Sequence, residues 1–295
     1  MTTFDELTDD VLSMLRGYVR SQESVTALNG SLNGTATTFN VDNGSRLGMG
    51  RAEIDDELVY IDAITTNAVS LQPWGRGVDG TTATTHSDNA RVTFNPLFPR
   101  HYVKRAINDT IQSMGVELKA QDVTTFTFLA SKNTYSIPAN VKSVFQVTWQ
   151  TVGPSGRWET VRRWQADTSA AAAAYATGKT ITVWDPIVPG RTVQVRFLKE
   201  PSNLSAGADT LETTVGFPAS CRDVVALGTA ARLVSSIDVA LLDPSSVQAG
   251  FFDERRQIGS ASNVARTLYA LYQQRLAEEI ARFRDNLNTP VHYRK

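Results

Sequence analysis

The sequence has 295 residues and is almost neutral, with 29 Lys and Arg against 30 Asp and Glu and a formal net charge of −1. A chain of this length can bury a sizeable core without staples. Its one cysteine, Cys221, excludes a disulfide within one chain, a cysteine zinc cluster and a redox pair. The balanced charge disfavours a domain that holds DNA by counterion release. We expect no cofactor and no metal site.

The first ten residues are acidic and lack the basic start and apolar run of a signal peptide. No stretch approaches the roughly 18 apolar residues of a membrane span. We therefore expect a protein that folds in the cytoplasm and has no membrane partner.

The first expected element is a short helix over residues 3–19, in which Leu7, Val11 and Leu15 recur at helical spacing behind an acidic first turn. Residues 24–95 then alternate between short apolar segments and turns rich in Gly, Asn and Thr. This alternation predicts a small β-rich block.

A second helix is expected over residues 99–118, because Val103, Ile107 and Ile111 follow one another at steps of four and so line one face. Residues 122–200 again form short apolar runs separated by turns with Pro and Gly. They predict a second β-rich block.

Two further helices are expected, over residues 218–237 and 262–287. Pro218 suits a first helical turn because its missing N–H would have no partner there, and Pro290 ends the last helix. The sequence thus predicts an α+β fold with a core of four helices and two β-rich blocks.

This pattern also predicts the division of the chain. The expected parts are an N-terminal core helix (1–20), an inserted β-module (21–96), a core helix (97–121), a β-rich domain (122–204), a helical core (205–287) and an extended tail (288–295).

The segment from Gly75 to Gly80 fits the G-x-G-x-x-G pattern of dinucleotide-binding loops. Such a loop needs a helix N-terminus directly after its glycines, where the pyrophosphate binds. Residues 81–85 are Thr-rich, have poor helix propensity and lead into another strand. The pattern therefore favours a Gly-rich loop between two strands.

No other group of residues forms a recognisable catalytic motif. His86, His101 and His292 stand in three different expected elements, without the spacing that places two metal ligands on one helix face. We interpret Cys221 as a small buried apolar residue. We expect no catalytic residue and no enzymatic activity.

The acidic residues Glu53, Asp55, Asp56, Glu278 and Glu279 could in principle serve acid–base chemistry. Neighbouring acids on a helix point in different directions, and residues 55–56 lie in a turn-like stretch. We interpret these carboxylates as solvated surface.

Residues 54–92 resemble a small β-module that recurs in virion proteins of tailed bacteriophages. The resemblance rests on an acidic start, two apolar strands and the pattern Arg-Gly-x-x-Gly-Thr-x-Ala-x-x-His before a closing strand. We interpret five residues of this pattern as a structural loop, in which glycines supply positive φ and side chains hydrogen-bond the backbone. They are Arg76, Gly77, Gly80, Thr81 and His86.

The rest of the chain is similar to the adaptor or connector family that docks beneath the portal of tailed phages. The similarity is carried by residues 105–111, by residues 133–138 followed by 141–147, and by the two late helices. It implies a structural head-to-tail adaptor in the virion neck, folded in the host cytoplasm. It further implies an oligomeric ring, commonly a dodecamer, around the channel for genome ejection, through which DNA passes without sequence-specific binding.

The implied partners are other copies of the chain, the portal protein and a downstream neck or tail protein. The C-terminal segment of this family reaches toward the portal. Because the tail cannot remain helical past Pro290, it should extend and could add a strand to a partner. The candidate portal-contacting residues are Val291, His292, Tyr293, Arg294 and Lys295. A frayed terminus is the alternative.

Two other functions stay open. One is a tail-tip or fibre component that binds a host-surface glycan through the β-module, with Trp74 and His86 in the site. The other is a virion-associated hydrolase, which would depend on His86 or Cys221.

Overall fold

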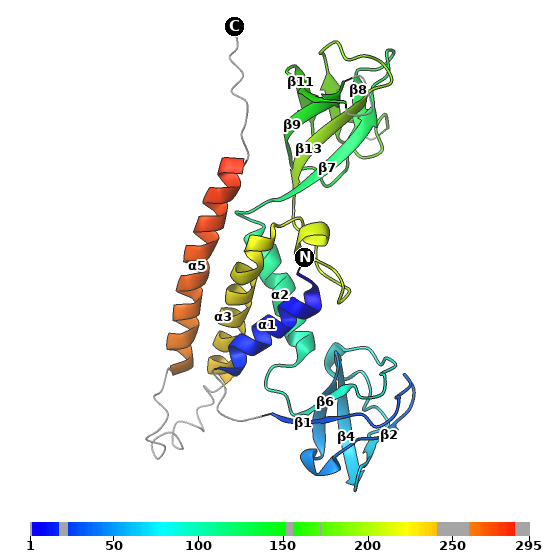
Figure 1. Ribbon diagram of the computed structural model, residues 1–295, viewed down its shortest axis with the longest axis vertical. Helices are drawn as coiled ribbons and strands as arrows, with labels where there is room; N and C mark the ends of the chain where they lie inside the picture. The colour runs from blue at the N-terminus through cyan, green and yellow to red at the C-terminus, as the bar shows by residue number, and fades with distance from the viewer. Residues whose placement is uncertain (1, 18–22, 152–155, 172, 241–259, 287–295) are drawn as a thin grey trace. The chain divides into compact units, whose positions relative to one another are not determined.

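The computed structural model describes residues 2–17, 23–151, 156–171, 173–240 and 260–286 (Figure 1). The chain divides into two compact units, each made of segments that are distant in the sequence. The first unit comprises Asp5–Asn108 and Ala226–Tyr269. The second unit comprises Met1–Phe4, Asp109–Val225 and Ala270–Lys295.

The first unit contains one six-stranded antiparallel sheet with the strand order β1-β6-β3-β4-β5-β2, which we call the first β block (Figure 1). Its strands are β1 (Ser24–Ala27), β2 (Thr38–Asn40), β3 (Gly50–Ile54), β4 (Glu57–Thr65), β5 (Ala68–Leu71) and β6 (Arg91–Phe94). Its alternating apolar side chains, such as Val59, Ile61 and Val92, gather in one buried cluster.

The two edges of this sheet meet. Directly after β1 and β2, Leu28 and Val41 form an antiparallel bridge, and the Asn29 N–H donates to the Asn40 carbonyl at 2.9 Å. The sheet therefore rolls into a barrel-like block, which satisfies backbone groups that an open edge would leave unpaired.

Two helices of the first unit bury the stripes expected from the sequence. Helix α1 (Phe4–Arg16) buries Leu7 and Val11, and helix α2 (Arg100–Met114) buries Val103 and Ile107. Both helices end earlier than the expected residues 19 and 118.

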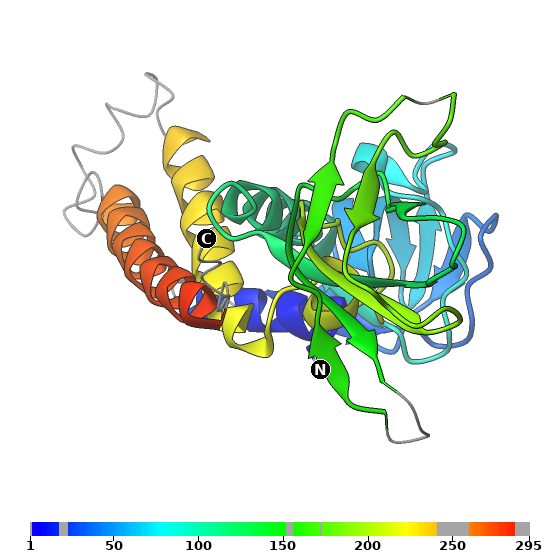
Figure 2. The same ribbon diagram turned by 90° about the horizontal axis from the view of Figure 1, so that it is seen from above.

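The second unit contains two antiparallel sheets, which we call together the second β block (Figures 1 and 2, green). Their strand orders are β10-β9-β13-β7 and β11-β12-β8. The strands are β7 (Ala120–Thr127), β8 (Thr134–Ser136), β9 (Ser143–Gln150), β10 (Trp158–Thr160), β11 (Trp164–Asp167), β12 (Thr180–Val183) and β13 (Thr192–Lys199). Both sheets contribute to one apolar cluster, in which Val147 and Phe197 come from one sheet and Ile181 from the other.

The late helices are α3 (Arg222–Ala240) and α5 (Ser260–Asn286). Pro218 caps a short 3-10 turn (Ala219–Cys221) before α3 rather than opening the α-helix itself. Within the second unit, α5 lies against the start of α3, because the Ser220 hydroxyl donates to Glu279 at 2.7 Å.

The expected fold class, α+β with a core of four helices, is wrong. Over the described residues the structure is mixed, with 31% helix, 31% strand and three antiparallel sheets, and a four-helix core is not shown there. Each β block instead has its own buried apolar cluster. An apolar stripe predicts that one face of a helix is buried, but it does not identify the element that covers that face. The prediction assumed that the helices cover one another, and it was wrong for that reason.

Within the described ranges, none of the helices has the length and apolar character that crossing a membrane demands.

Candidate functional site

Four acidic side chains lie at or beside the turn between β3 and β4: Asp55 and Asp56 in the turn, Glu53 near the end of β3 and Glu57 at the start of β4. Asp55 has a φ of 53°, in the left-handed region that Asp adopts more readily than most residues. Asp55 and Glu57 contact the Gly-rich loop, whereas Glu53 and Asp56 contact the start of α2. The turn therefore joins two polar networks.

Glu57 is the centre of the first network and is 2% exposed. Its carboxylate accepts hydrogen bonds from Arg76 Nε (2.6 Å), Arg76 Nη2 (3.0 Å), His86 Nε2 (2.9 Å), and the N–H groups of Gly77 (3.0 Å) and Thr84 (2.9 Å). Burial by itself would raise the pKa of Glu57, but these donors lower it to about 2. Glu57 is therefore a buried anion at neutral pH.

The guanidinium of Arg76 uses all five of its N–H donors. Besides the two bonds to Glu57, Nη2 donates to the Thr84 carbonyl at 2.7 Å, and Nη1 donates to the carbonyls of Asn33 and Ala36, both at 2.8 Å. Arg76 thus ties the Gly-rich loop to the loop that precedes β2.

His86 is also buried, at 2% exposed, and lies between two carboxylates. Its Nδ1 is 2.8 Å from Asp55 Oδ2, and its Nε2 is 2.9 Å from Glu57 Oε2. Burial would lower the pKa of His86, but the hydrogen bonds and charges of Asp55 and Glu57 raise it to about 9. At neutral pH the ring is an imidazolium that donates from both nitrogens.

The other predicted loop residues shape the backbone. Gly77 and Gly80 have φ values of 61° and 83°. Thr81 Oγ1 accepts from the Leu58 N–H at 3.1 Å and donates to the Val78 carbonyl at 2.8 Å. The glycines lead into a 3-10 turn (Val78–Gly80), and residues 81–85 are not helical, so this loop lacks the helix N-terminus of a dinucleotide site.

These contacts have one physical consequence. The positive charges of Arg76 and His86 balance the negative charges of Asp55 and Glu57. The polar side-chain atoms of Glu57, Arg76 and His86, the three buried residues of this network, already have partners. A network in this state holds a loop in shape and offers no free group to a ligand. Sequence reasoning treated Glu57 only as part of an acidic start; its position at the head of an apolar strand was the available signal, because a buried acid requires partners.

The second network joins the same turn to α1 and α2. Asp56 accepts from Arg100 Nε at 3.2 Å and from Lys104 Nζ at 2.6 Å. Asp5 lies 2.7 Å from Lys104 Nζ, and Asp9 accepts from Arg100 Nη1. The ion pairs therefore fix the β3–β4 turn against both helices.

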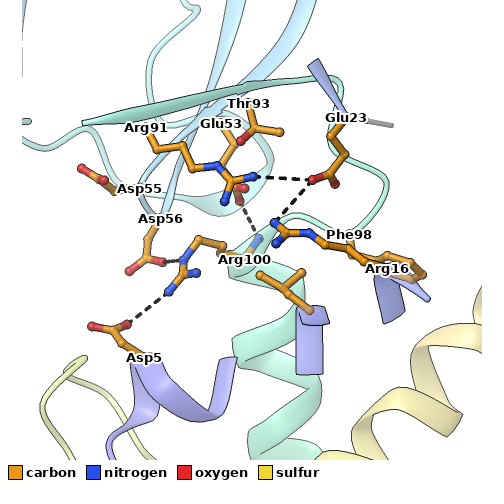
Figure 3. A pocket seen from close by; sticks show the side chains of 11 residues that line it. Asp5, Arg16, Glu23, Glu53, Asp55, Asp56, Arg91, Thr93, Phe98 and Arg100 are labelled. Carbon is orange, nitrogen blue, oxygen red and sulfur yellow. Dashed lines mark hydrogen bonds and ion pairs between the residues drawn. The ribbon is translucent and has the colours of Figure 1, made fainter. Parts of the chain in front are cut away.

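A cavity of about 340 Å³ lies beside this network (Figure 3). Figure 3 shows Arg16 and Arg91 directed toward Glu23, and the Arg100 N–H directed toward Glu53. Burial raises the pKa of Glu53 to about 7, against the opposing effect of Arg100. Within the described part of the chain, no group of three or more His, Cys, Asp or Glu is placed to hold a metal ion.

Two carboxylates interpreted as solvated surface are in fact buried. Glu53 is 6% exposed, and Glu279 is 2% exposed and accepts from Ser220 Oγ and from Arg282 Nη1 at 2.9 Å. That interpretation is therefore wrong for both residues. Their partners are remote in the sequence or on another turn of the helix, which spacing alone did not identify.

Cys221 is fully buried, as interpreted from the sequence. Burial, followed by the charges of Glu279 and Asp223, raises the pKa of its thiol to about 12. Because the thiolate is the reactive form, this cysteine is a poor nucleophile at neutral pH. The candidate tail residues 291–295 lie outside the described residues.

The chain was found to match a known family. A family model described as SU10 adaptor protein matches residues 81–294. The matched span begins directly after Gly80, so β1 to β5 precede it and the whole second β block lies within it. No curated protein matches the chain.

Proposed function

The chain belongs to the SU10 adaptor protein family, a family of phage structural adaptors, and we propose that it forms a ring beneath the portal of a tailed phage. In this proposal the ring is a dodecamer in the virion neck that connects the portal to the next neck or tail protein. DNA passes through its channel during genome ejection.

The family match carries this proposal, because it extends over both late helices, the second β block and the C-terminal segment. The candidate site gives independent support to a structural role. Its buried charges are paired with one another, as expected of a scaffold in which the position of each loop matters more than a reaction.

The exposed side chains of the second unit also support assembly. Trp158 and Trp184 are 43% and 50% exposed on the second β block, and Leu271 is 44% exposed on α5. A closed ring requires two different contact surfaces on each copy. Large aromatic side chains are the residues most often found at the centre of such contacts.

Native mass spectrometry of the full-length protein, alone and with the portal protein of the same phage, tests the proposal. We expect a closed oligomer of one copy number, or a monomer that assembles only on the portal. A protein that stays monomeric and never joins the portal would exclude the ring.

The C-terminal tail can be tested in the same experiment. Deletion of residues 288–295 should leave the fold intact and weaken portal docking, because an extended tail binds through backbone groups and an aromatic anchor. Near-ultraviolet circular dichroism verifies that the shortened protein is folded. Unchanged docking after the C-terminal deletion would remove the tail from the proposed interface.

The alternative of a tail-tip or fibre component is not favoured by the geometry of His86. This residue was the polar group expected to contact a glycan, but it is buried and both ring nitrogens are within hydrogen-bond distance of carboxylates. Trp74 does remain exposed.

A further inference from the structure

Two aromatic rings lie exposed on the outside of the first β block. Tyr60 is 37% exposed and Trp74 is 62% exposed, with ring centroids 5.2 Å apart and planes inclined at 41°. Neither side chain belongs to the buried cluster of the block. The pair therefore presents a broad aromatic surface to the outside.

Backbone hydrogen bonds fix this pair. Residues 72–75 form a turn closed by the Gly75 N–H and the Gln72 carbonyl at 2.8 Å, with Pro73 at the position that suits its fixed φ. The Tyr60 N–H donates to the Gly75 carbonyl at 2.8 Å, and the Gln72 N–H donates to the Tyr60 carbonyl at 3.2 Å. The turn is thus bonded at both ends to the residue whose ring Trp74 contacts.

Gly75 is required for this close approach. A Cβ at this position would lie 2.7 Å from the Tyr60 carbonyl oxygen. A bulkier residue would push the turn away from β4 and separate Trp74 from Tyr60. The glycine that seemed to begin a dinucleotide motif instead positions an exposed indole.

Polar pairs flank the two rings. Arg51 is the cross-strand partner of Tyr60, so both side chains lie on one face of the sheet, and Arg51 Nη1 is 3.1 Å from Asp79 Oδ2. Asp62, at a bulge of β4, accepts from Gln72 Nε2. We call these residues the Trp74 face: Arg51, Tyr60, Asp62, Gln72, Trp74 and Asp79.

We propose that the Trp74 face binds a neutral carbohydrate. A sugar ring has an apolar face of C–H groups, which stacks on aromatic rings, and a rim of hydroxyl groups, which both donate and accept hydrogen bonds. Trp74 and Tyr60 supply the stacking surface. The planar groups of Asp62 and Gln72 on one side, and of Arg51 and Asp79 on the other, supply polar partners for the rim.

The charge of the face selects the class of sugar. It holds two carboxylates and one guanidinium, so a sialylated or phosphorylated glycan would meet a net negative surface. A protein is the other occupant to test, since Trp, Tyr and Arg are also enriched at protein contacts. The sugar is favoured because both rings are flanked by exposed polar pairs, Arg51 with Asp79 and Gln72 with Asp62, which suit a rim of hydroxyl groups. Binding of no sugar by this face would favour the protein.

This inference is independent of the ring. All six residues of the Trp74 face precede the matched span 81–294. A sugar site on the first β block would give the adaptor a contact with a polysaccharide, in addition to its connecting role.

The test is saturation-transfer NMR and titration calorimetry on the full-length protein. The probes are chitotriose, maltotetraose and lactose, with sialyllactose as the charged counterpart of lactose. We expect at least one neutral sugar to bind through its ring C–H protons and more tightly than sialyllactose. Trp74→Ala should raise its Kd about tenfold or more, which corresponds to about 1.4 kcal/mol.

Trp184→Ala is the matched control, because it removes an indole of similar exposure from the second β block. It should bind sugar as the wild type does. Gln72→Ala, which leaves both rings in place, should weaken binding to a smaller degree. Near-ultraviolet circular dichroism verifies that each variant is folded.

Three results would overturn the proposal. They are the absence of binding by all three neutral sugars at millimolar concentration, wild-type binding by Trp74→Ala, and sialyllactose binding as tight as that of lactose. A negative result would not bear on the proposed ring, because the oligomer and the portal contact are measured in a separate experiment.

Discussion

The two β blocks are stabilised in different ways. In the first block, long loops rich in Gly and Asn are held by a buried ionic cluster around Glu57. In the second block, loops are held by aromatic packing: Phe126 and Tyr135 stack at 4.0 Å, and the Tyr135 hydroxyl donates to the Lys132 carbonyl at 2.6 Å and accepts from the Leu129 N–H at 2.8 Å. Both blocks have a buried apolar cluster, so the difference lies in the loops: charge-assisted hydrogen bonds hold those of the first block, and aromatic packing holds those of the second.

The largest expected effect is that of Glu57→Ala. It leaves the charges of Arg76 and His86 buried without their main partner, which typically costs about 3–5 kcal/mol. Hydrogen-exchange mass spectrometry should show faster exchange throughout residues 24–94 and little change in residues 120–199. Glu159→Ala, at an exposed acid of the second block, is the control and should change neither block. An equal loss of protection from hydrogen exchange in both blocks would contradict the claim that they are stabilised differently.

A change of pH should act on the same block. Because the folded-state pKa of His86 is raised to about 9, its contribution is fully present below its usual value of about 6.5 and is lost as the pH rises through about 9. We expect the first block to lose about 1–3 kcal/mol over that interval. Calorimetric unfolding from pH 6.5 upward measures this loss. In His86→Gln, which cannot titrate, the same stretch of the curve should be flatter; an unchanged slope would contradict the assignment.

Tyr135→Phe tests the same difference between the two blocks, this time by a change in the second block. The ring and its stacking on Phe126 remain, but the Leu129 N–H loses its acceptor. We expect a loss of about 1 kcal/mol, confined to the second block. Hydrogen exchange of residues 129–135 should rise, with residues 24–94 unaffected. A spread of the effect into the first block would show that the two blocks do not respond separately.

In mild acid, Glu53→Gln should have the smallest effect of these variants. The pKa of Glu53 is raised to about 7, so folding favours its protonated form; that contribution is fully present below about 4.5 and is lost as the pH rises through about 7. Gln is neutral and can still accept from the Arg100 N–H. We expect thermal unfolding within about 0.5 kcal/mol of wild type in mild acid, and a variant more stable than wild type above pH 7. A variant less stable than wild type at high pH would contradict the raised pKa of Glu53.

Sequence reasoning located features that depend on neighbouring residues. The period of four in α2 placed Val103 and Ile107 on a buried face, and the Arg-Gly-x-x-Gly-Thr pattern identified the loop that surrounds Glu57. Features that depend on remote pairs were missed. Glu53 and Glu57 are buried because their partners stand 47 and 19 to 29 positions away. Trp74 was named as a candidate glycan contact, but its contact with Tyr60 depends on how β4 and the 72–75 turn fold.

The central claim is that this chain is a neck adaptor. Electron cryomicroscopy of the phage virion tests it most directly, because the second β block and the late helices give a recognisable shape to each copy. We expect a closed ring of these copies in direct contact with the portal, surrounding the DNA channel. Density for this chain at the tail tip or on a fibre, with a different protein beneath the portal, would contradict the account.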